Sequence, residues 1–535
     1  MNIRCQLSSI LLLIPLLVGC RESRVEPQPS VRPDPDRIVR LHYLGKKRLG
    51  LEAGAYYFNR IWALPETERL QSQTLDKLAT APWRFFADPS SWTNAPVALL
   101  RSLLDDIVQE ESFLEVHGTS NEEPQFAFAI RLSEARSGAW ETNLAVVAQS
   151  LTGVWPEQSR HPRGWKWAST NSSAKRELQR LENWLVITAW TGNTNRFGSV
   201  AETIGRHGIP FPVKATNAWI EGEVDLAAVA TILGRKENTA WLPGGSRLEF
   251  SVEGDGGNVI SRGELDTTEP LNLVLEPWNF PTNLIREPLA SFTAVRGLRS
   301  LLPLVLPAEW QYLDGILPDQ LCVWTGDGSL PHVNFAIPTT NLVHEMDVVS
   351  NYLISKGNTW LKRYSGGGFE PMSPYKGVSW NGLPEVTPFI MAASLHTGFL
   401  YGGTAPETRT NTIAVSDAML NDIVRRTNAL YYDWEMTGSR IVPEIYLTQI
   451  ARLALRRGQL PVDGAALTWL KALSPRMSAS TTIFSFATRE QVQGIRKSTV
   501  GFTARELAIL ADWLESPDFP FALCSSGGSA TSTSQ

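Results

Sequence analysis

The stretch Arg247-Leu248-Glu249-Phe250-Ser251-Val252-Glu253-Gly254-Asp255-Gly256-Gly257 indicates how this chain of 535 residues folds. Its apolar side chains alternate one by one with charged or polar ones. A period of two is typical of a β-strand with one buried face. The glycine-rich end supplies the residues that a tight turn needs. We therefore predict a β-hairpin here, with one apolar face and one charged face.

The hairpin completes a pattern of one strand, one amphipathic helix and two further strands. In this copy the first strand covers 218–224 and the helix 226–233. Three other copies begin with strands at 126–132, 290–296 and 430–436. The copies share a pattern rather than residues, so coincidence is the alternative to duplication. We predict an α+β fold: one or two extended antiparallel sheets, covered on one face by helices and built from repeated strand–helix–hairpin units.

Two copies carry more detailed expectations. In the first copy, the two strands after the helix are expected around 165–169 and 178–190. After the fourth copy, Thr503-Ala504-Arg505-Glu506 has the spelling of a capping box, which begins a helix. Ahead of the first copy the chain is mostly helical, and we expect a helix over 67–79 to end before Pro82.

The composition predicts two folded lobes between polar ends. Residues 20–37 contain four prolines and balanced charge, which indicates a disordered tether that begins with Cys20. We expect an N-terminal α+β lobe over 38–276 and a C-terminal α+β lobe over 284–524. The Ser/Gly/Thr-rich tail 525–535 is expected to be disordered.

The amino terminus has the features of an export signal. Arg4 precedes the apolar run Ser8 to Val18, which is too short to span a bilayer as a helix. The ending Leu17-Val18-Gly19-Cys20 resembles the lipobox of bacterial lipoproteins. An ordinary cleaved signal with an accidental cysteine is the alternative.

The lipobox resemblance implies a location and an anchor. Residues 1–19 would be a signal peptide, and Cys20 would carry a diacylglyceryl group on its sulfur. Each buried methylene of such a lipid contributes about 0.8 kcal/mol to membrane attachment. Because Arg21 rather than an aspartate follows Cys20, the resemblance favours the outer membrane, facing the periplasm.

Charge and hydropathy exclude some functions. The formal net charge is −5, and loss of Arg4 with residues 1–19 makes it −5 − 1 = −6. No clustered basic surface is indicated, so we expect no nucleic-acid partner. No second apolar run approaches about 18 residues, which makes a later transmembrane helix unexpected. The membrane would be reached through Cys20.

Two cysteines remain in the body of the chain. Cys322 and Cys524 could pair in an exported protein, but sequence cannot test whether they are close in space. We favour buried free thiols on apolar strands and keep the disulfide as the alternative.

Two groups of residues are candidates for catalysis. Asp433 and Glu435 would share one face of a strand, and paired carboxylates beside aromatic residues are the equipment of glycoside hydrolysis. Ser173 lies in Ser172-Ser173-Ala174-Lys175, which matches the S-x-x-K nucleophile motif of penicillin-binding proteins. An ordinary exposed strand explains the first pattern more simply. Chance explains the second, because neither S-D-N nor K-T-G follows.

The expectation for function is accordingly broad. We favour a non-enzymatic, lipid-anchored envelope protein that binds or scaffolds, with no cofactor and no metal. Its ligand could be a protein, a glycan or an apolar molecule. The alternatives are an envelope glycan hydrolase and a carrier of apolar ligands. As a whole, the body resembles the large uncharacterised exported proteins of Gram-negative bacteria.

Overall fold

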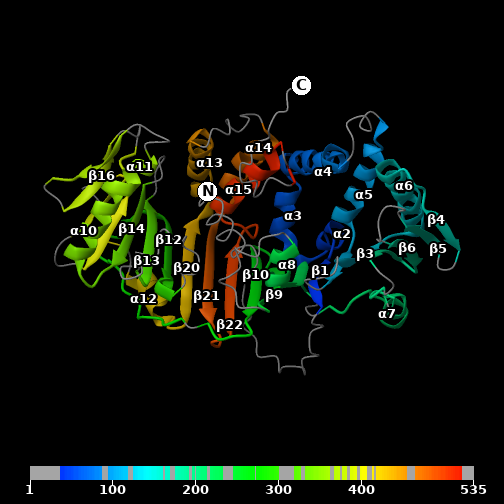
Figure 1. Cartoon of the computed structure of the whole chain (residues 1–535), viewed down its shortest axis with the longest axis horizontal. Coiled ribbons are helices and arrows are strands. Elements are labelled where there is room, and N and C mark those ends of the chain that lie inside the picture. The colour runs from blue at the N-terminus through cyan, green and yellow to red at the C-terminus, as the bar shows by residue number, and fades with distance from the viewer. Residues whose placement is uncertain are drawn as a thin grey trace. The chain divides into compact units, whose positions relative to one another are not determined.

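A computed structural model shows how the chain folds (Figure 1). The residues that it describes are 36–86, 94–118, 124–160, 163–168, 175–191, 195–198, 200–213, 217–232, 245–271, 273–300, 318–326, 332–361, 367–373, 376–381, 386–393, 398–405, 413–414, 417–454, 464–517 and 519–520. Among them, 36–269 with 513–520 form one compact unit, the N-terminal unit. The rest, between Pro270 and Asp512, form the C-terminal unit.

The N-terminal unit has an antiparallel sheet of ten described strands with seven described α-helices. The strands are β1 (Arg37–Tyr43), β2 (Ser112–His117), β3 (Gln125–Arg131), β4 (Glu157–Arg160), β5 (Arg163–Ala168), β6 (Lys175–Leu181), β7 (Trp184–Trp190), β8 (Ile220–Asp225), β9 (Arg247–Gly254) and β10 (Val259–Asp266). The helices are α2 (Lys46–Leu49), α3 (Tyr56–Trp62), α4 (Pro65–Phe86), α5 (Val97–Gln109), α6 (Glu134–Thr152), α7 (Val200–His207) and α8 (Leu226–Ile232).

The C-terminal unit also has a large antiparallel sheet. Its strands in the described part of the chain are β12 (Leu289–Arg296), β13 (Gln320–Gly326), β14 (Val333–Pro338), β15 (Gly368–Pro371), β16 (Gly377–Asn381), β17 (Phe389–Ala392), β18 (Phe399–Gly403), β20 (Ala429–Met436), β21 (Ala479–Phe486) and β22 (Gln491–Ser498). The short strands β11 (Arg286–Glu287) and β19 (Ile413–Ala414) pair with each other. Its helices include α10 (Leu342–Tyr352), α11 (Asn358–Leu361), α12 (Asp417–Arg425), α13 (Thr437–Ala454), α14 (Ala465–Leu473) and α15 (Ala504–Glu515), which begins in this unit.

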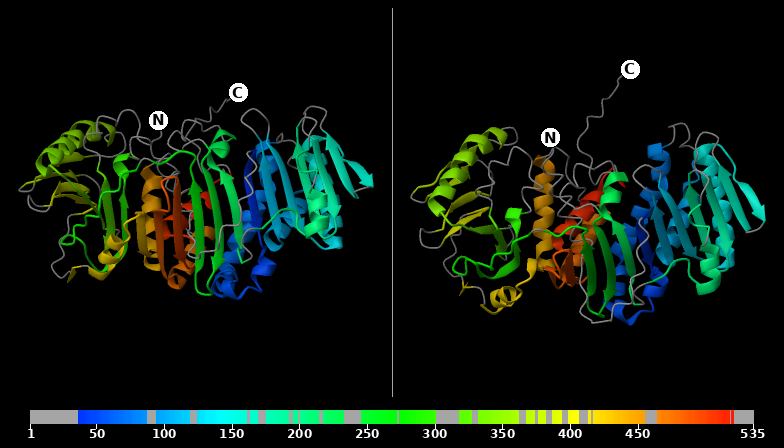
Figure 2. Two further views of the ribbon diagram at one scale, coloured as in Figure 1. Left: turned by 90° about the horizontal axis from the view of Figure 1, so that it is seen from below. Right: turned by 60° about the horizontal axis from the view of Figure 1, so that its bottom comes forward.

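The two sheets have the same strand order. Counted from β10, the N-terminal sheet runs β10-β9-β8-β1-β2-β3-β7-β6-β5-β4. The C-terminal sheet runs β22-β21-β20-β12-β13-β14-β18-β17-β16-β15. If the strands of each sheet are renumbered along the chain, β1 corresponds to β12 and β8 to β20. All sheet neighbours then agree, and Figure 2 shows the strands lying side by side within each sheet.

The hairpin predicted from 247–257 is confirmed. β9 and β10 pair antiparallel from Arg247 with Asp266 to Gly254 with Val259. The Asp255 side chain accepts hydrogen bonds from the backbone N–H of Gly257, at 3.0 Å, and of Asn258, at 2.7 Å. An aspartate that bonds the backbone two or three residues ahead stabilises a tight turn.

In the region of β3, helices cover both faces of the N-terminal sheet. The prediction that helices cover only one face is wrong here. The reason is that the successive β3 residues Phe126 to Ile130 are all apolar and their side chains point alternately to opposite faces. Ala127 and Ala129 pack in a core with Ile204 of α7. Ile130 packs in a second core with Leu103 of α5 and Trp140 of α6. Figure 1 places α6 and α7 on opposite sides of these strands.

The first predicted copy of the repeated pattern is wrong in its strand count. Four described strands, β4 to β7, follow α6 instead of two. The apolar run expected as a single strand over 178–190 turns at Glu182 and Asn183, so that Leu181 pairs with Trp184. Glu182 has a φ of 53°, a left-handed conformation that permits the turn.

The α+β class and the antiparallel sheets are confirmed. Among the described residues, no helix combines the length and the apolar character that crossing a membrane requires. The cores are rich in aromatic side chains, of which Trp83, Trp184 and Trp324 are among the largest that are fully buried.

Candidate functional site

The two carboxylates predicted as candidates lie side by side in the C-terminal sheet. Asp433 and Glu435 are on β20, between β12 and β21, and their side chains point to the same face. Thr293 is opposite Asp433 on β12, and Ser480 is opposite Glu435 on β21. Asp433 is 7% exposed and Glu435 is 2% exposed. This strand face is therefore buried, whereas an ordinary exposed strand was the simpler expectation.

Each carboxylate is bonded inside the protein. The hydroxyl of Thr293 donates to Oδ1 of Asp433 at 2.6 Å. Oε1 of Glu435 accepts from the backbone N–H of Ala504 at 2.7 Å, and Oε2 lies 3.2 Å from a guanidinium nitrogen of Arg440. Because Arg440 is on α13 and Ala504 begins α15, these bonds connect both helices to β20.

Five further charged residues surround this pair. Arg440 and Arg505 both bind the carboxylate of Glu444, which is buried on α13. Arg496 of β22 makes two bonds to Glu506 of α15, at 2.8 and 3.0 Å. We call this set the charge cluster; its members are Asp433, Glu435, Arg440, Glu444, Arg496, Arg505 and Glu506.

The charge cluster changes the acidity of the two candidate carboxyls. Burial raises the pKa of Glu435 to about 7, and the Asp433 charge adds to this, although Arg440 opposes it. Burial also raises the pKa of Asp433, although the Thr293 hydrogen bond and Arg440 act in the opposite direction. A raised carboxyl pKa is characteristic of a general acid. Here its principal cause is desolvation beneath two helices.

The arrangement is better suited to joining elements than to cleaving a glycan. A general acid must come within hydrogen-bond reach of the bond that it protonates. The oxygens of Glu435 instead contact a helix N-terminus and a guanidinium, with almost no exposed surface. Asp433 likewise contacts Thr293 of the neighbouring strand.

The other candidate residues are distributed as follows. Ser173, Cys20 and Cys524 lie outside the described residues. Cys322 is on β13, 3% exposed, and its sulfur lies 3.6 Å from the carbonyl oxygen of Ala336. Burial raises the pKa of the Cys322 thiol to about 12, which makes it a poor nucleophile. It is a free thiol in the structure, and whether it pairs with Cys524 stays a prediction.

A second group of polar and charged side chains, not predicted from the sequence, lies on the N-terminal sheet. His42 of β1 stacks on Phe113, with ring centroids 4.2 Å apart. Its Nε2 is 3.1 Å from Oε1 of Glu111, and its Nδ1 is 4.0 Å from Oε1 of Glu221. Nearby, Glu223 accepts from Arg37 at 2.7 Å. The alternation of charged and apolar residues in β1 and β8 was the available signal.

Cationic neighbours keep the Glu111 carboxyl acidic. Burial alone would raise the pKa of Glu111, but hydrogen bonds from His42, Arg48 and Arg131 together lower it. The pKa of Glu115 is lowered in the same way, by His117 and Arg40 against burial. These carboxylates are satisfied by ion pairs within the N-terminal unit.

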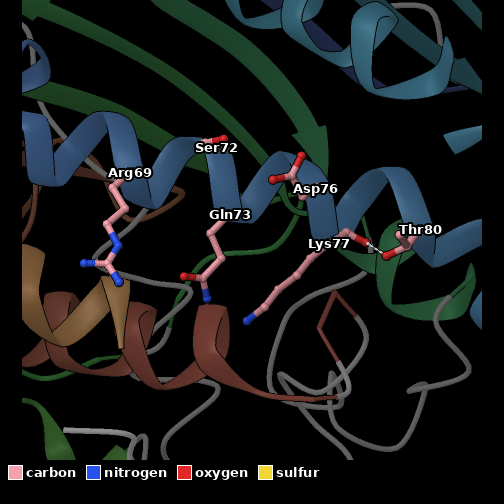
Figure 3. Close-up of a pocket in the computed structure, with 6 residues that line it drawn as sticks. All are labelled: Arg69, Ser72, Gln73, Asp76, Lys77 and Thr80. Carbon is pink, nitrogen blue, oxygen red and sulfur yellow. Dashed lines mark hydrogen bonds between the residues drawn. The ribbon is translucent and has the colours of Figure 1, made fainter. Parts of the chain in front are cut away.

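A shallow groove of about 610 Å³ lies along α4 (Figure 3). Gln73 donates to Glu515 at 3.1 Å, and Lys77 donates to the carbonyl oxygen of Leu514. Ligand pockets are usually concave and mostly apolar, whereas all the residues that line this groove are polar. They are Arg69, Ser72, Gln73, Asp76, Lys77 and Thr80.

Within the described ranges, no group of three or more His, Cys, Asp or Glu side chains is arranged to hold a metal ion.

The chain matches no model of a known protein family, no curated protein and no solved structure.

Proposed function

We propose that this protein is a lipid-anchored component of a bacterial cell envelope that acts by binding or scaffolding. The lipobox spelling at Leu17 to Cys20 supports the anchor, and Arg21 favours the outer membrane, facing the periplasm. The observation that favours binding over catalysis is the engagement of Asp433 and Glu435 with Thr293, Ala504 and Arg440. The best acid–base pair in the sequence is thereby used to hold the fold together.

The anchor is tested with Cys20→Ser in the full chain. Wild-type protein should take up labelled fatty acid in cells and sediment with membranes. The variant should not incorporate the label. It should either keep its signal peptide uncleaved or appear in the soluble fraction. A Cys5→Ser variant is the matched control, because Cys5 lies within the signal and should not be lipidated. A Cys20→Ser protein that still carries the fatty acid would contradict the proposal.

The binding role is tested against the glycan hydrolase. Purified protein would be incubated with isolated peptidoglycan, first for cosedimentation and then for released fragments. A scaffold should release no fragments, whether or not it cosediments. Fragments released by wild-type protein, and lost in Asp433→Ala or Glu435→Ala, would establish the hydrolase. The carrier would instead be supported by a bound apolar molecule extracted from the purified protein.

We also propose that the two units arose by duplication of one ten-stranded unit. The support is their common strand order, in which β1 corresponds to β12 and β8 to β20. The second and fourth copies of the strand–helix–hairpin pattern agree with this, because β8, α8, β9 and β10 follow the same order as β20, α13, β21 and β22, with α14 added after α13. An experimentally determined structure should superpose the two units strand for strand, and a different order in either unit would contradict the duplication.

A further inference from the structure

The charge cluster has one more acidic member than it has basic members. Four of its members are carboxylic acids, at 433, 435, 444 and 506, and all four are less than a tenth exposed. Three are arginines, at 440, 496 and 505. Arginine does not lose its proton in proteins. With every carboxyl ionised, the cluster would therefore have one uncompensated negative charge.

The ion pairs show where the uncompensated charge falls. Arg496 is committed to Glu506 by two hydrogen bonds, and its side chain is 2% exposed. Glu444 takes both Arg440 and Arg505. Arg440 is then shared with Glu435, at 3.2 Å. Asp433 accepts a hydrogen bond from the neutral hydroxyl of Thr293, and among the described residues no arginine donates to it.

We propose that the charge cluster holds one proton, shared between Asp433 and Glu435, and that release of this proton to solvent loosens α13 and α15 from β20. Burying an unpaired charge costs several kcal/mol, so a buried site retains a proton when that restores neutrality. The proton passes to water as hydronium, and the carboxyl group that releases it becomes a carboxylate.

The groups that face the pair come from every element packed around it. On β20 itself there is Tyr431, which burial keeps neutral by raising its pKa. α13 contributes Arg440 and Glu444, β22 contributes Arg496, and α15 contributes Arg505 and Glu506. From the positions opposite the pair, β12 contributes the hydroxyls of Ser291 and Thr293, and β21 those of Ser480 and Thr482. The raised pKa values of Asp433 and Glu435 agree with a shared proton.

The consequence for the helices follows from the bonds of Glu435. Its carboxyl group contacts α15 through the Ala504 N–H and α13 through Arg440. With one proton on the pair, the cluster is neutral and these contacts remain. Without it, two negative charges share one strand face, on residues whose Cα atoms are about 7 Å apart by strand rise, and opening the helices to water is the available relief.

The test is hydrogen exchange, followed by mass spectrometry, in peptides that cover α13 and the first turn of α15. Asp433→Asn keeps an acceptor for Thr293 and removes the excess charge at every pH. Exchange rates of wild type and variant are compared at the same pH, which cancels the intrinsic chemical rate. At pH 5.5 we expect the wild-type and Asp433→Asn proteins to exchange at nearly the same rate. At pH 8 we expect roughly tenfold faster exchange in the wild type, because one proton changes an equilibrium by up to about tenfold per pH unit.

Glu444→Gln is the matched control. It also removes one negative charge from the cluster, but from a carboxylate held by two arginines. We expect it to exchange faster than wild type at both pH values. A wild-type to Asp433→Asn ratio that does not change with pH, or an Asp433→Asn variant that behaves like Glu444→Gln, would overturn the proposal.

A second measurement does not depend on a variant that folds. Infrared spectra of the wild-type protein at pH 7 should contain the C=O stretch of a protonated carboxylic acid, which ionised carboxylates lack. This band should disappear between pH 7 and pH 9 together with the protection of α15. Its absence at pH 7 would contradict the bound proton, whatever the exchange data show.

Discussion

The carboxylate of Glu435 accepts a hydrogen bond of 2.7 Å from the backbone N–H of Ala504, 69 residues further along the chain. A helix N-terminus has backbone N–H groups without partners inside the helix and carries a partial positive charge. An acidic side chain is therefore favourable there. In this fold the carboxylate comes from a central strand, so that one bond joins the sheet to α15.

The stability of the protein should fall as the pH rises from about 5 to 8. Burial in the folded state raises the pKa of Glu435 from its ordinary value of 4.5 to about 7. A group whose pKa is raised by folding binds more protons folded than unfolded. Its contribution is complete below pH 4.5 and is lost as the pH rises through 7, by at most about 3 kcal/mol. Thermal unfolding of wild type followed by circular dichroism across this range measures the change.

Glu435→Gln is the control for this pH dependence, because it does not titrate. Its melting temperature should vary less with pH over the same range. Glu111 and Glu115 have lowered pKa values, so their contributions change mainly at lower pH. A wild-type protein that becomes more stable between pH 5 and 8 would contradict the assignment.

Breaking the buried Arg496–Glu506 pair should be costly. Arg496→Met removes a guanidinium that is 2% exposed and leaves the Glu506 carboxylate without its partner. Removing one member of a buried pair typically costs about 3–5 kcal/mol. The matched control is Arg299→Met, because Arg299 pairs with Glu276 at 3.3 Å with both side chains about half exposed. Urea unfolding should show a loss below about 1 kcal/mol for the control; equal losses would contradict the prediction.

The capping box at the start of α15 should be worth about 1 kcal/mol. Oγ1 of Thr503 accepts from the Glu506 N–H at 3.3 Å, and the Thr503 N–H donates to Glu506 at 2.9 Å. Thr503→Ala removes the first bond and should lower the free energy of unfolding by about that amount. Thr503→Ser keeps the hydroxyl and should have little effect. Equal losses in the two variants, measured by urea unfolding, would indicate that the threonine methyl group matters instead.

The features that could be predicted from sequence are local ones. The hairpin of β9 and β10 was predictable because its alternation and its turn lie within about 20 residues. The capping box at Thr503 was predictable because the two residues are three positions apart. Such patterns depend on backbone geometry that is the same in every protein.

The charge cluster could be predicted only in part. Asp433 and Glu435 were identified as a pair, but their partners Thr293 and Ala504 are 140 and 69 residues away. Bringing these together requires the order and register of the strands, and a shift of one residue would turn both carboxylates to the other face. The burial that raises their pKa values was therefore outside the reach of a local pattern.

Packing also overrode one strong local signal. The helix expected to end before Pro82 continues to Phe86 as α4, with the proline inside it. Proline in a helix interior costs roughly 3 kcal/mol or more. Next to it, Trp83 is 2% exposed, and Arg84 donates to the carbonyl oxygen of Phe519. Contacts with a segment more than 400 residues away offset the cost.

The β9–β10 hairpin offers a final prediction that uses two of its glycines. A Cβ atom at Gly254 would lie 2.3 Å from the backbone oxygen of Gly54 and 2.2 Å from the Trp219 ring. Contacts this short force the backbone or the indole to move, and overpacking of this kind typically costs about 1–3 kcal/mol. Gly254→Ala should therefore lower the free energy of unfolding measured in urea.

Gly257→Ala is the matched control, because it lies in the turn of the same hairpin and makes the same chemical change. A Cβ atom there would meet nothing closer than Oδ1 of Asp255, at 3.8 Å. We expect this variant to unfold within about 0.5 kcal/mol of wild type, as surface substitutions usually do. If Gly257→Ala were as damaging as Gly254→Ala, the turn conformation rather than the close approach of Gly54 and Trp219 would require glycine. A loss confined to Gly254 would instead identify the turn end of the hairpin as a packed junction between η1 (Ala53–Ala55) and β9.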